Sequence, residues 1–308
     1  MIDTDKPIIV VGAGVIGLSV ALQLREQGYK NITSVAKYIP GDVCIEYTSP
    51  YAGAHWRTMA PNSDKLLQKF DAVTYDRFMD LAHSSDNTGI MIAPSYDYYD
   101  DALSSEVTDP WFKDVVQDFE FLTEKEDLPH GAQLGHKYTT VLINTPVYIA
   151  WLASKFKSLG GKIVQRNLGH IDEVLSAKEP QWTQGINYVI PRSDGTVVLG
   201  GTANKHDFNP FPETQTNNTI LEKTFALCPE LKEQPLEIVK YNVGLRPSRI
   251  GGVRIENEML TSRNRKQTIQ VTHGYGHGGF GVQSSWGSAE YIVQVMENGL
   301  IKSTAARL

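Results

Sequence analysis

Residues 6–28 read KPIIVVGAGVIGLSVALQLREQG, and this stretch decides the fold of the amino-terminal part of the chain. The β-branched run IIVV is followed at once by Gly12, Gly14 and Gly17, and then by apolar residues at helical spacing. A second β-branched run occupies residues 31–35. Strand, glycine turn, helix and strand make a βαβ unit, which predicts a parallel sheet.

The glycine turn is typical of a dinucleotide-binding site. Its first glycine permits the tight turn, the second lets backbone amides approach a pyrophosphate, and the third lets helix and strand pack closely. The positive end of the helix dipole favours phosphate. We therefore expect cofactor contacts from Gly12, Ala13, Gly14, Val15, Ile16 and Gly17.

The end of the second strand does not identify the dinucleotide. The acidic residue that binds the ribose of NAD is missing there, and Ala36 and Lys37 take its place. A basic residue is compatible with the phosphorylated ribose of NADP. The turn by itself therefore leaves NAD, NADP and FAD open.

Composition and charge exclude other classes of function. The 308 residues carry a formal net charge of −6 without any basic stripe, so we expect no nucleic-acid partner. Cys44 and Cys228 share no metal-ligand spacing, and we expect no metal site. We find no secretory leader and no apolar run long enough for a membrane span, so we expect no membrane partner.

The segment VGLRPSR, residues 243–249, places an arginine in an otherwise apolar turn. Burying Arg246 there would be costly without an anion, and its planar fork suits bidentate capture of a carboxylate. The alternative is an internal ion pair with an aspartate or glutamate.

Residues 273–281, HGYGHGGFG, hold five glycines and precede a helical pattern. A backbone without side chains lets a large flat ligand come close, and the following helix would aim its positive end at it. This arrangement suits a flavin that takes up negative charge. Because His273 and His277 have no cysteine or carboxylate partners at ligand spacing, we expect hydrogen-bonding or packing histidines.

Taken together, these segments resemble the fungal-like D-amino-acid oxidase and D-aspartate oxidase family of FAD enzymes. The matching pieces occur in family order over almost the whole chain: VVGAGVIGLS (10–19), YTSPYAGAHW (47–56), INYVIPRSDGTVVLGGT (186–202), VGLRPSR (243–249) and HGYGHGGFGVQSSWG (273–287).

The resemblance implies an α/β fold in which a Rossmann-type FAD-binding domain is interleaved with a substrate domain built on a mixed, largely antiparallel sheet. It places the FAD-binding domain at residues 1–55, 140–180 and 255–308, and the substrate domain at residues 56–139 and 181–254. Within the latter, we expect residues 96–101, YDYYDD, to form a surface loop.

The resemblance also assigns roles to individual residues. The substrate carboxylate would bind Arg246 and the hydroxyl of Tyr188, and the carbonyl of Gly279 would accept a hydrogen bond from the substrate amine. FAD would contact residues beyond the glycine turn, which are Ala36, Lys37, Thr48, Ser49, Gly53, Ala54, Leu168, Gly278, Gly279, Gly281, Val282 and Gln283.

The chemistry implied is hydride transfer from the α-carbon of a D-amino acid to flavin N5. Dioxygen would be reduced to hydrogen peroxide, and a 2-oxo acid and ammonia would be released. In such a family, Ala306-Arg307-Leu308 reads as a peroxisomal address for an import receptor, and otherwise we expect a cytoplasmic protein. His55 and Arg57 stand where a substrate side-chain pocket would be, which favours acidic substrates such as D-aspartate.

One departure from the family pattern lies between Leu175 and Gln181. The family carries a strand there, with an Asn-Cys-Thr-Gly-like element and later an Arg-Gly-Gln element, and neither occurs in this chain. The loss would expose neighbouring strands and weaken FAD retention. Two alternatives therefore stay open: an internally deleted, weak or silent flavoprotein that acts as a binding protein, and a related amine or glycine oxidase.

Overall fold

The computed structural model describes residues 3–100, 104–167, 187–204, 207–233, 235–261 and 268–305. The chain forms two compact units. The first contains Met1–Pro50, Ile149–Pro180 and Arg246–Leu308, and the second contains Tyr51–Tyr148 and Gln181–Leu245.

The first unit holds the predicted βαβ unit. β1 (Ile8–Val11), α1 (Val15–Glu26) and β2 (Ile32–Ala36) follow one another, and β2 pairs in parallel with both β1 and β6 (Lys162–Gln165). The strand order is β1-β2-β6. The parallel sheet predicted from the β-branched runs and the glycine turn is confirmed.

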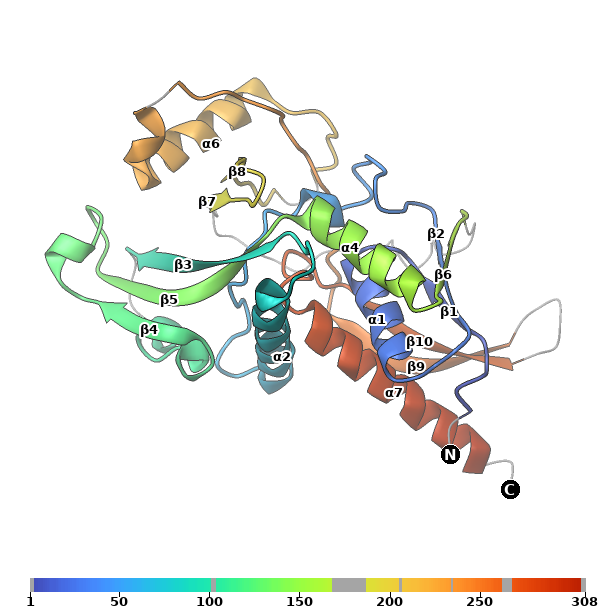
Figure 1. Ribbon diagram of the computed structural model, residues 1–308. Helices are drawn as coiled ribbons and strands as arrows, with labels where there is room; N and C mark the ends of the chain where they lie inside the picture. The colour runs from blue at the N-terminus through green and yellow to red at the C-terminus, as the bar shows by residue number, and fades with distance from the viewer. Residues whose placement is uncertain are drawn as a thin grey trace. The chain divides into compact units, whose positions relative to one another are not determined.

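One face of this sheet is covered by two helices. α7 (Ser285–Ala305) lies beside α1 in Figure 1. Their contact contains a cluster of buried side chains: Val20, Ala21, Leu24, Tyr29, Ile32, Phe156, Ala289, Ile292 and Val293. On the opposite face, Ile9 is 65% exposed, Val11 51% and Val164 44%. The parallel sheet is therefore buried on one face only at these positions.

An antiparallel pair completes the first unit. β9 (Arg254–Thr261) pairs with β10 (Thr268–Tyr275), and α7 packs against both strands. Sequence reasoning missed β9, because polar residues alternate along it and leave no apolar run to recognise.

The second unit contains an antiparallel sheet. Its strand order is β3-β5-β4, formed by β3 (Ile90–Tyr99), β5 (Leu134–Ile143) and β4 (Gln117–Leu122). The expected loop at residues 96–101 is wrong for its first four residues, because Tyr96–Tyr99 continue β3 and pair with Leu134–Lys137. Cross-strand contacts with β5 stabilise this polar, tyrosine-rich run as a strand.

A capped helix and a hairpin also belong to the second unit. α2 (Lys65–His83) begins at Asp64, whose carboxylate caps the amide of Leu67 at 3.0 Å. β7 (Tyr188–Pro191) and β8 (Val197–Gly200) form an antiparallel hairpin. Among the described residues, the remaining helical segments are η1 (Ser49–Tyr51), α3 (Ser105–Thr108), η2 (Trp111–Asp114), η3 (Lys125–Asp127), α4 (Thr145–Ser158), α6 (Thr214–Leu227) and η4 (Pro229–Lys232).

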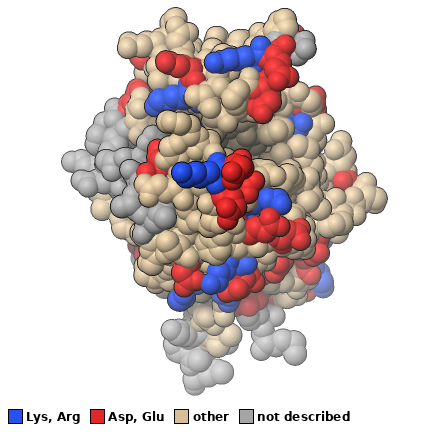
Figure 2. Space-filling view, turned by 90° about the vertical axis from the view of Figure 1, so that its left-hand side faces the viewer, with Lys and Arg blue, Asp and Glu red and all other residues tan. Residues whose placement is uncertain are grey.

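The predicted fold class is confirmed, with a parallel sheet in one unit and antiparallel pairing in the other. Within the described residues, no helix combines the length and apolar character needed to cross a bilayer. On the face drawn in Figure 2, lysine and arginine side chains lie among aspartates and glutamates instead of gathering by sign.

Candidate active site

The glycine turn has the backbone geometry that a dinucleotide site requires. Gly12 has a φ of +107°, a region that favours glycine, and its N–H donates to the carbonyl of Val35 at 2.9 Å. A Cβ on Gly17 would overlap the carbonyl oxygen of Gly12. Only glycine therefore lets α1 start so close to the end of β1.

The long loop after β2 closes over this turn. The hydroxyl of Ser49 accepts a hydrogen bond from the amide of Val15 at 3.0 Å, and a Cβ on Gly14 would lie 2.9 Å from that oxygen. The buried hydroxyl of Tyr47 donates to the carbonyl of Ala13 at 2.7 Å. The structure thus brings the predicted cofactor residue Ser49 onto the glycine turn. Tyr47 is a positioning residue that sequence reasoning missed.

At the end of β2, Ala36 is buried, while Lys37 forms an ion pair with Glu46 at 2.7 Å. Glu46 also accepts a hydrogen bond from the hydroxyl of Tyr38 at 2.9 Å. The hydrogen bond to Glu46 raises the pKa of Lys37. The positive charge at this position is therefore balanced inside the loop.

Arg246 lies beside the glycine-rich segment, as predicted. A Cβ on Gly279 would lie 3.3 Å from both Cδ and Nε of Arg246. Arg246 is exposed, so its guanidinium carries no burial cost that an anion would have to offset in this structure. The close approach to a residue without a side chain, and not burial, distinguishes this guanidinium.

The glycine-rich segment forms a tight turn before α7. Gly278 has a φ of +57°, and its N–H donates to the carbonyl of Pro247 at 3.2 Å. A Cβ on Gly281 would lie 3.3 Å from the Cβ of His277. The next two predicted cofactor residues, Val282 and Gln283, are buried. The segment is thus joined to the VGLRPSR segment that carries Arg246.

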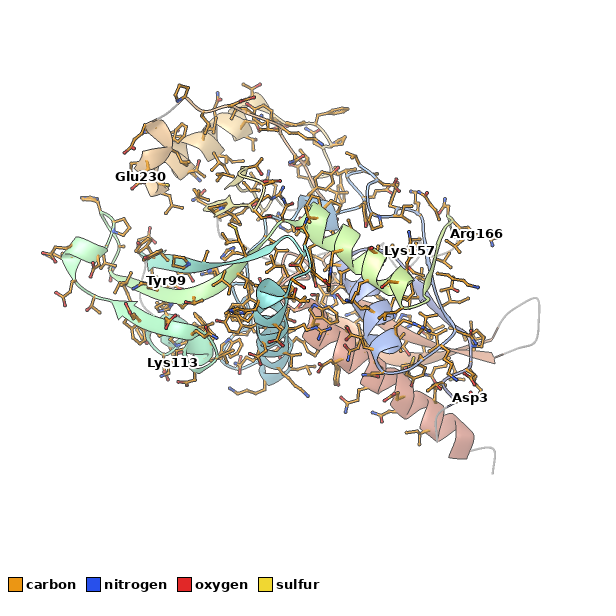
Figure 3. All side chains as sticks on the ribbon, viewed as in Figure 1. Asp3, Tyr99, Lys113, Lys157, Arg166 and Glu230 are labelled. Atoms are coloured by element: carbon orange, nitrogen blue, oxygen red, sulfur yellow. The ribbon has the colours of Figure 1, made fainter. Side chains whose placement is uncertain are left out.

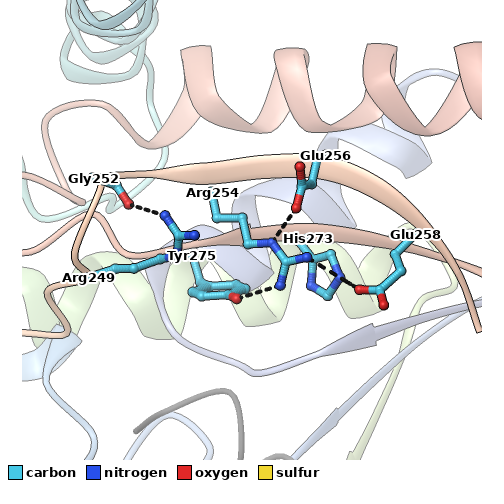
Figure 4. A network of polar contacts seen from close by, with 7 residues as sticks. All are labelled: Arg249, Gly252, Arg254, Glu256, Glu258, His273 and Tyr275. Atoms are coloured by element: carbon cyan, nitrogen blue, oxygen red, sulfur yellow. Dashed lines mark hydrogen bonds and ion pairs between the residues drawn. The ribbon is translucent and has the colours of Figure 1, made fainter. Parts of the chain in front are cut away.

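The two histidines of this segment have separate polar partners. His273 contacts Glu258 at 2.9 Å, within the network of β9 and β10 in Figure 4 that also contains Arg254, Glu256 and Tyr275. The other, His277, is 3% exposed, and its Nε2 lies 3.1 Å from the hydroxyl of Ser288. Across the described ranges, no group of three or more histidines, cysteines or carboxylates could hold a metal ion.

In the second unit, Tyr188 packs on a pair of glycines. A Cβ on Gly200 would overlap the Tyr188 ring, and one on Gly201 would lie 2.8 Å from its hydroxyl oxygen. These two glycines at the end of β8 therefore fix the position of the predicted substrate-binding hydroxyl.

The hairpin is also joined to the predicted cofactor residues Gly53 and Ala54. Arg192 donates from Nε to the carbonyl of Gly53 at 2.9 Å and from Nη2 to that of Ala52 at 3.1 Å. The amide of Ala54 donates to the carbonyl of Ile143 at 3.0 Å, which adds this segment to the edge of β5. Sequence reasoning missed Arg192, although it directly follows the strand that carries Tyr188.

His55 and Arg57 follow in the same segment. The Nε of Arg57 lies 3.1 Å from Oδ2 of Asp97 on β3. Burial lowers the pKa of His55 to about 4, so this imidazole is neutral at pH 7. The structure brings both predicted pocket residues together, but it gives Arg57 an anionic partner that sequence reasoning did not find.

Known proteins resemble this chain along almost its whole length. The family model described as DAO, FAD dependent oxidoreductase, matches residues 7–185 and 176–295. A D-amino-acid oxidase of Schizosaccharomyces pombe is 31% identical, with 94% of this chain and 96% of that protein covered. A D-aspartate oxidase of Talaromyces thermophilus is 26% identical, with 94% of each covered. A solved glycine oxidase of Bacillus cereus has a TM-score of 0.69 at 20% identity, with 95% of each chain covered.

The chain belongs to this family of FAD dependent oxidoreductases. It is therefore an oxidoreductase enzyme, and its cofactor is FAD. The glycine turn fits that cofactor, because the positions facing its backbone carry no side chains and a Cβ at Gly14 or Gly17 would collide with the turn or its covering loop. The individual contacts assigned to Thr48, Gly53 and the other FAD residues stay predictions.

This chain is shorter than an aligned relative, and its two matches to the family model meet in the stretch after Leu175. The family model matches in two stretches that overlap at residues 176–185. The alignment with the Schizosaccharomyces protein spans 341 positions, although this chain has 308 residues. The relative therefore carries residues that this chain lacks. Leu168, the shortened stretch after Leu175, and Ala306-Arg307-Leu308 lie outside the described residues, and the expectations for them stay predictions.

Replacing Gly17 with alanine is expected to weaken FAD binding about tenfold to a hundredfold, because the added Cβ forces α1 away from Gly12. Titration of the apoprotein with FAD, followed by flavin fluorescence, measures the Kd. Gly131→Ala is the control for general destabilisation, since a side chain at its φ of +94° strains the backbone while the added Cβ would meet no atom within 4 Å. Equal affinities in the two variants would contradict the prediction.

His277 makes stability depend on pH. Burial lowers its pKa from 6.5 to about 4, so the unfolded chain takes up a proton before the folded chain does. The contribution of the neutral His277 to the free energy of unfolding is fully present above pH 6.5. It falls by about 3 kcal/mol as the pH drops to about 4. Urea unfolding of His277→Gln should show a smaller loss over this range than the wild type. The exposed His130→Gln is the control, and equal slopes in all three proteins exclude the effect.

Proposed function

We propose that this enzyme catalyses oxidative deamination of D-amino acids. The observation that carries the proposal is the position of the exposed Arg246 guanidinium against Gly279, in the segment that precedes α7. The similarity to D-amino-acid oxidases at about 30% identity over most of the chain supports it. When bound, FAD supplies hydride acceptance from the substrate α-carbon, with dioxygen as the final acceptor and hydrogen peroxide as its product.

The chain's own residues bind and orient the amino acid. The guanidinium of Arg246 pairs with the substrate carboxylate through charge-assisted hydrogen bonds. The carbonyl of Gly279 accepts a hydrogen bond from the substrate amine, and the hydroxyl of Tyr188 donates to the carboxylate. Orientation of the α-hydrogen is the main task of such a site, so no general base is required from the chain. The imino acid leaves and is hydrolysed to a 2-oxo acid and ammonia.

Acidic substrates such as D-aspartate remain candidates, because Arg57 stands in the predicted side-chain pocket. The similarity to a D-aspartate oxidase supports this candidate. The ion pair between Arg57 and Asp97 opposes it. Peroxisomal import through Ala306-Arg307-Leu308 stays a prediction.

A weak or silent flavoprotein is the alternative, and the shortened stretch after Leu175 supports it. Purification with FAD, a visible spectrum and anaerobic addition of D-alanine separate the two. We expect a yellow protein whose visible absorption bleaches, and that forms hydrogen peroxide when air is readmitted. A yellow protein that does not bleach with any D-amino acid would favour the silent form, and bleaching by glycine alone would favour a glycine oxidase.

Arg246→Met is expected to lower kcat/KM for D-alanine about a hundredfold or more, because the carboxylate loses a charged partner. Steady-state kinetics in an oxygen-consumption assay measure the loss. Lys113→Met is the control, since Lys113 is paired with Asp109 on the surface. If the substrate carboxylate binds elsewhere, the two variants should have the same kcat/KM for D-alanine.

A further inference from the structure

Asp97 is a carboxylate held from two sides. Its Oδ2 lies 3.1 Å from Nε of Arg57 and accepts a hydrogen bond from the hydroxyl of Tyr138, also at 3.1 Å. The side chain of Asp97 is 11% exposed, and Tyr138 is 1% exposed. A carboxylate so far removed from water needs a cationic partner, and Arg57 provides it.

The Arg57 side chain is more exposed to solvent than that of Asp97. It is 35% exposed, and Nη1 lies 3.4 Å from the sulfur of Met59. Attraction to Asp97 raises the pKa of Arg57, so the guanidinium stays charged. Tyr99, labelled in Figure 3, lies two residues after Asp97 on β3, and burial raises the pKa of its hydroxyl.

The charges around Arg57 therefore sum to zero at neutral pH. Arg57 contributes one positive charge, Asp97 one negative charge, and the neutral His55 none. A substrate carboxylate that approaches Arg57 meets a cation whose field is already cancelled by a second carboxylate. Like-charge repulsion from Asp97 thereby reduces the net gain from pairing with Arg57.

We infer that Asp97 is a specificity-determining residue that makes the enzyme favour neutral over acidic amino acids by engaging Arg57. This inference rests on the proposed function and on the predicted side-chain pocket at His55 and Arg57. Asp97 acts through Arg57 and is not itself a ligand of the substrate. Loss of its negative charge leaves Arg57 in place as an uncompensated cation.

Asp97→Asn tests the inference, because the amide keeps the shape and an oxygen acceptor for Tyr138, replaces the second oxygen with an NH2 group and removes the charge. Succinate and propionate serve as probes, since they are D-aspartate and D-alanine without the amine and are not deaminated. Calorimetric Kd values for the holoenzyme should show the affinity for succinate relative to propionate rising about tenfold. The kcat/KM ratio of D-aspartate to D-alanine should rise by a similar factor.

Glu120→Gln is the matched control, since it breaks an ion pair of 3.0 Å with Lys137 in the same sheet and removes the same charge. Its succinate-to-propionate ratio should equal that of the wild type. In an Arg57→Met background, Asp97→Asn should no longer raise the ratio. Asp97→Ser, which also removes the charge, is measured alongside in case the asparagine variant does not fold.

An unchanged ratio in folded Asp97 variants overturns the inference, and so does an equal rise in Glu120→Gln. A rise that persists without Arg57 also overturns it. Failure of the proposed function gives a different result, because no D-amino acid would then bleach the flavin of the wild type. The binding ratio of the two probes would still report on Asp97 in that case.

Discussion

The approach of α1 to the end of β1 is the constraint on which the cofactor-binding unit depends. Because a Cβ on Gly17 would overlap the carbonyl oxygen of Gly12, the helix can start this close to the strand only with glycine at that position. The helix start then presents the Val15 amide and the Ala13 carbonyl to the loop after β2, where Ser49 and Tyr47 bind them. The missing side chain at Gly17 thus helps to place Tyr47 and Ser49, which lie more than thirty positions away in the sequence.

The sequence predicted those elements whose residue pattern is recognisable over a short stretch of chain. β1, α1, β2 and the helix after the glycine-rich segment all carry local periodicity or turn residues, and the structure confirms them. Tyr96–Tyr99 were misassigned because their strand is stabilised by β5, which lies far along the chain. The same reason hid the partner of Arg57, since Asp97 is forty residues away and nothing in its own surroundings marks it as a counter-ion.

The candidate site divides into parts with different physical requirements. The glycine turn relies on close backbone approach, so glycines and carbonyl contacts dominate its geometry, and the glycines leave clear marks in the sequence. In the proposed side-chain pocket, substrate selection would rely on charge balance, in which a residue acts only through its partner. Arg246 and Arg57 illustrate the contrast, since one guanidinium lies beside a glycine and is exposed, while the other is engaged by a carboxylate.

The parallel sheet leaves Ile9, Val11 and Val164 substantially exposed on the face away from α1 and α7. Apolar side chains in contact with water carry a heat-capacity signature, because covering them lowers the heat capacity of the system. The driving force for covering them weakens on cooling. Any contact that covers these three side chains therefore gains less free energy in the cold than at room temperature, whatever the state of the catalytic groups.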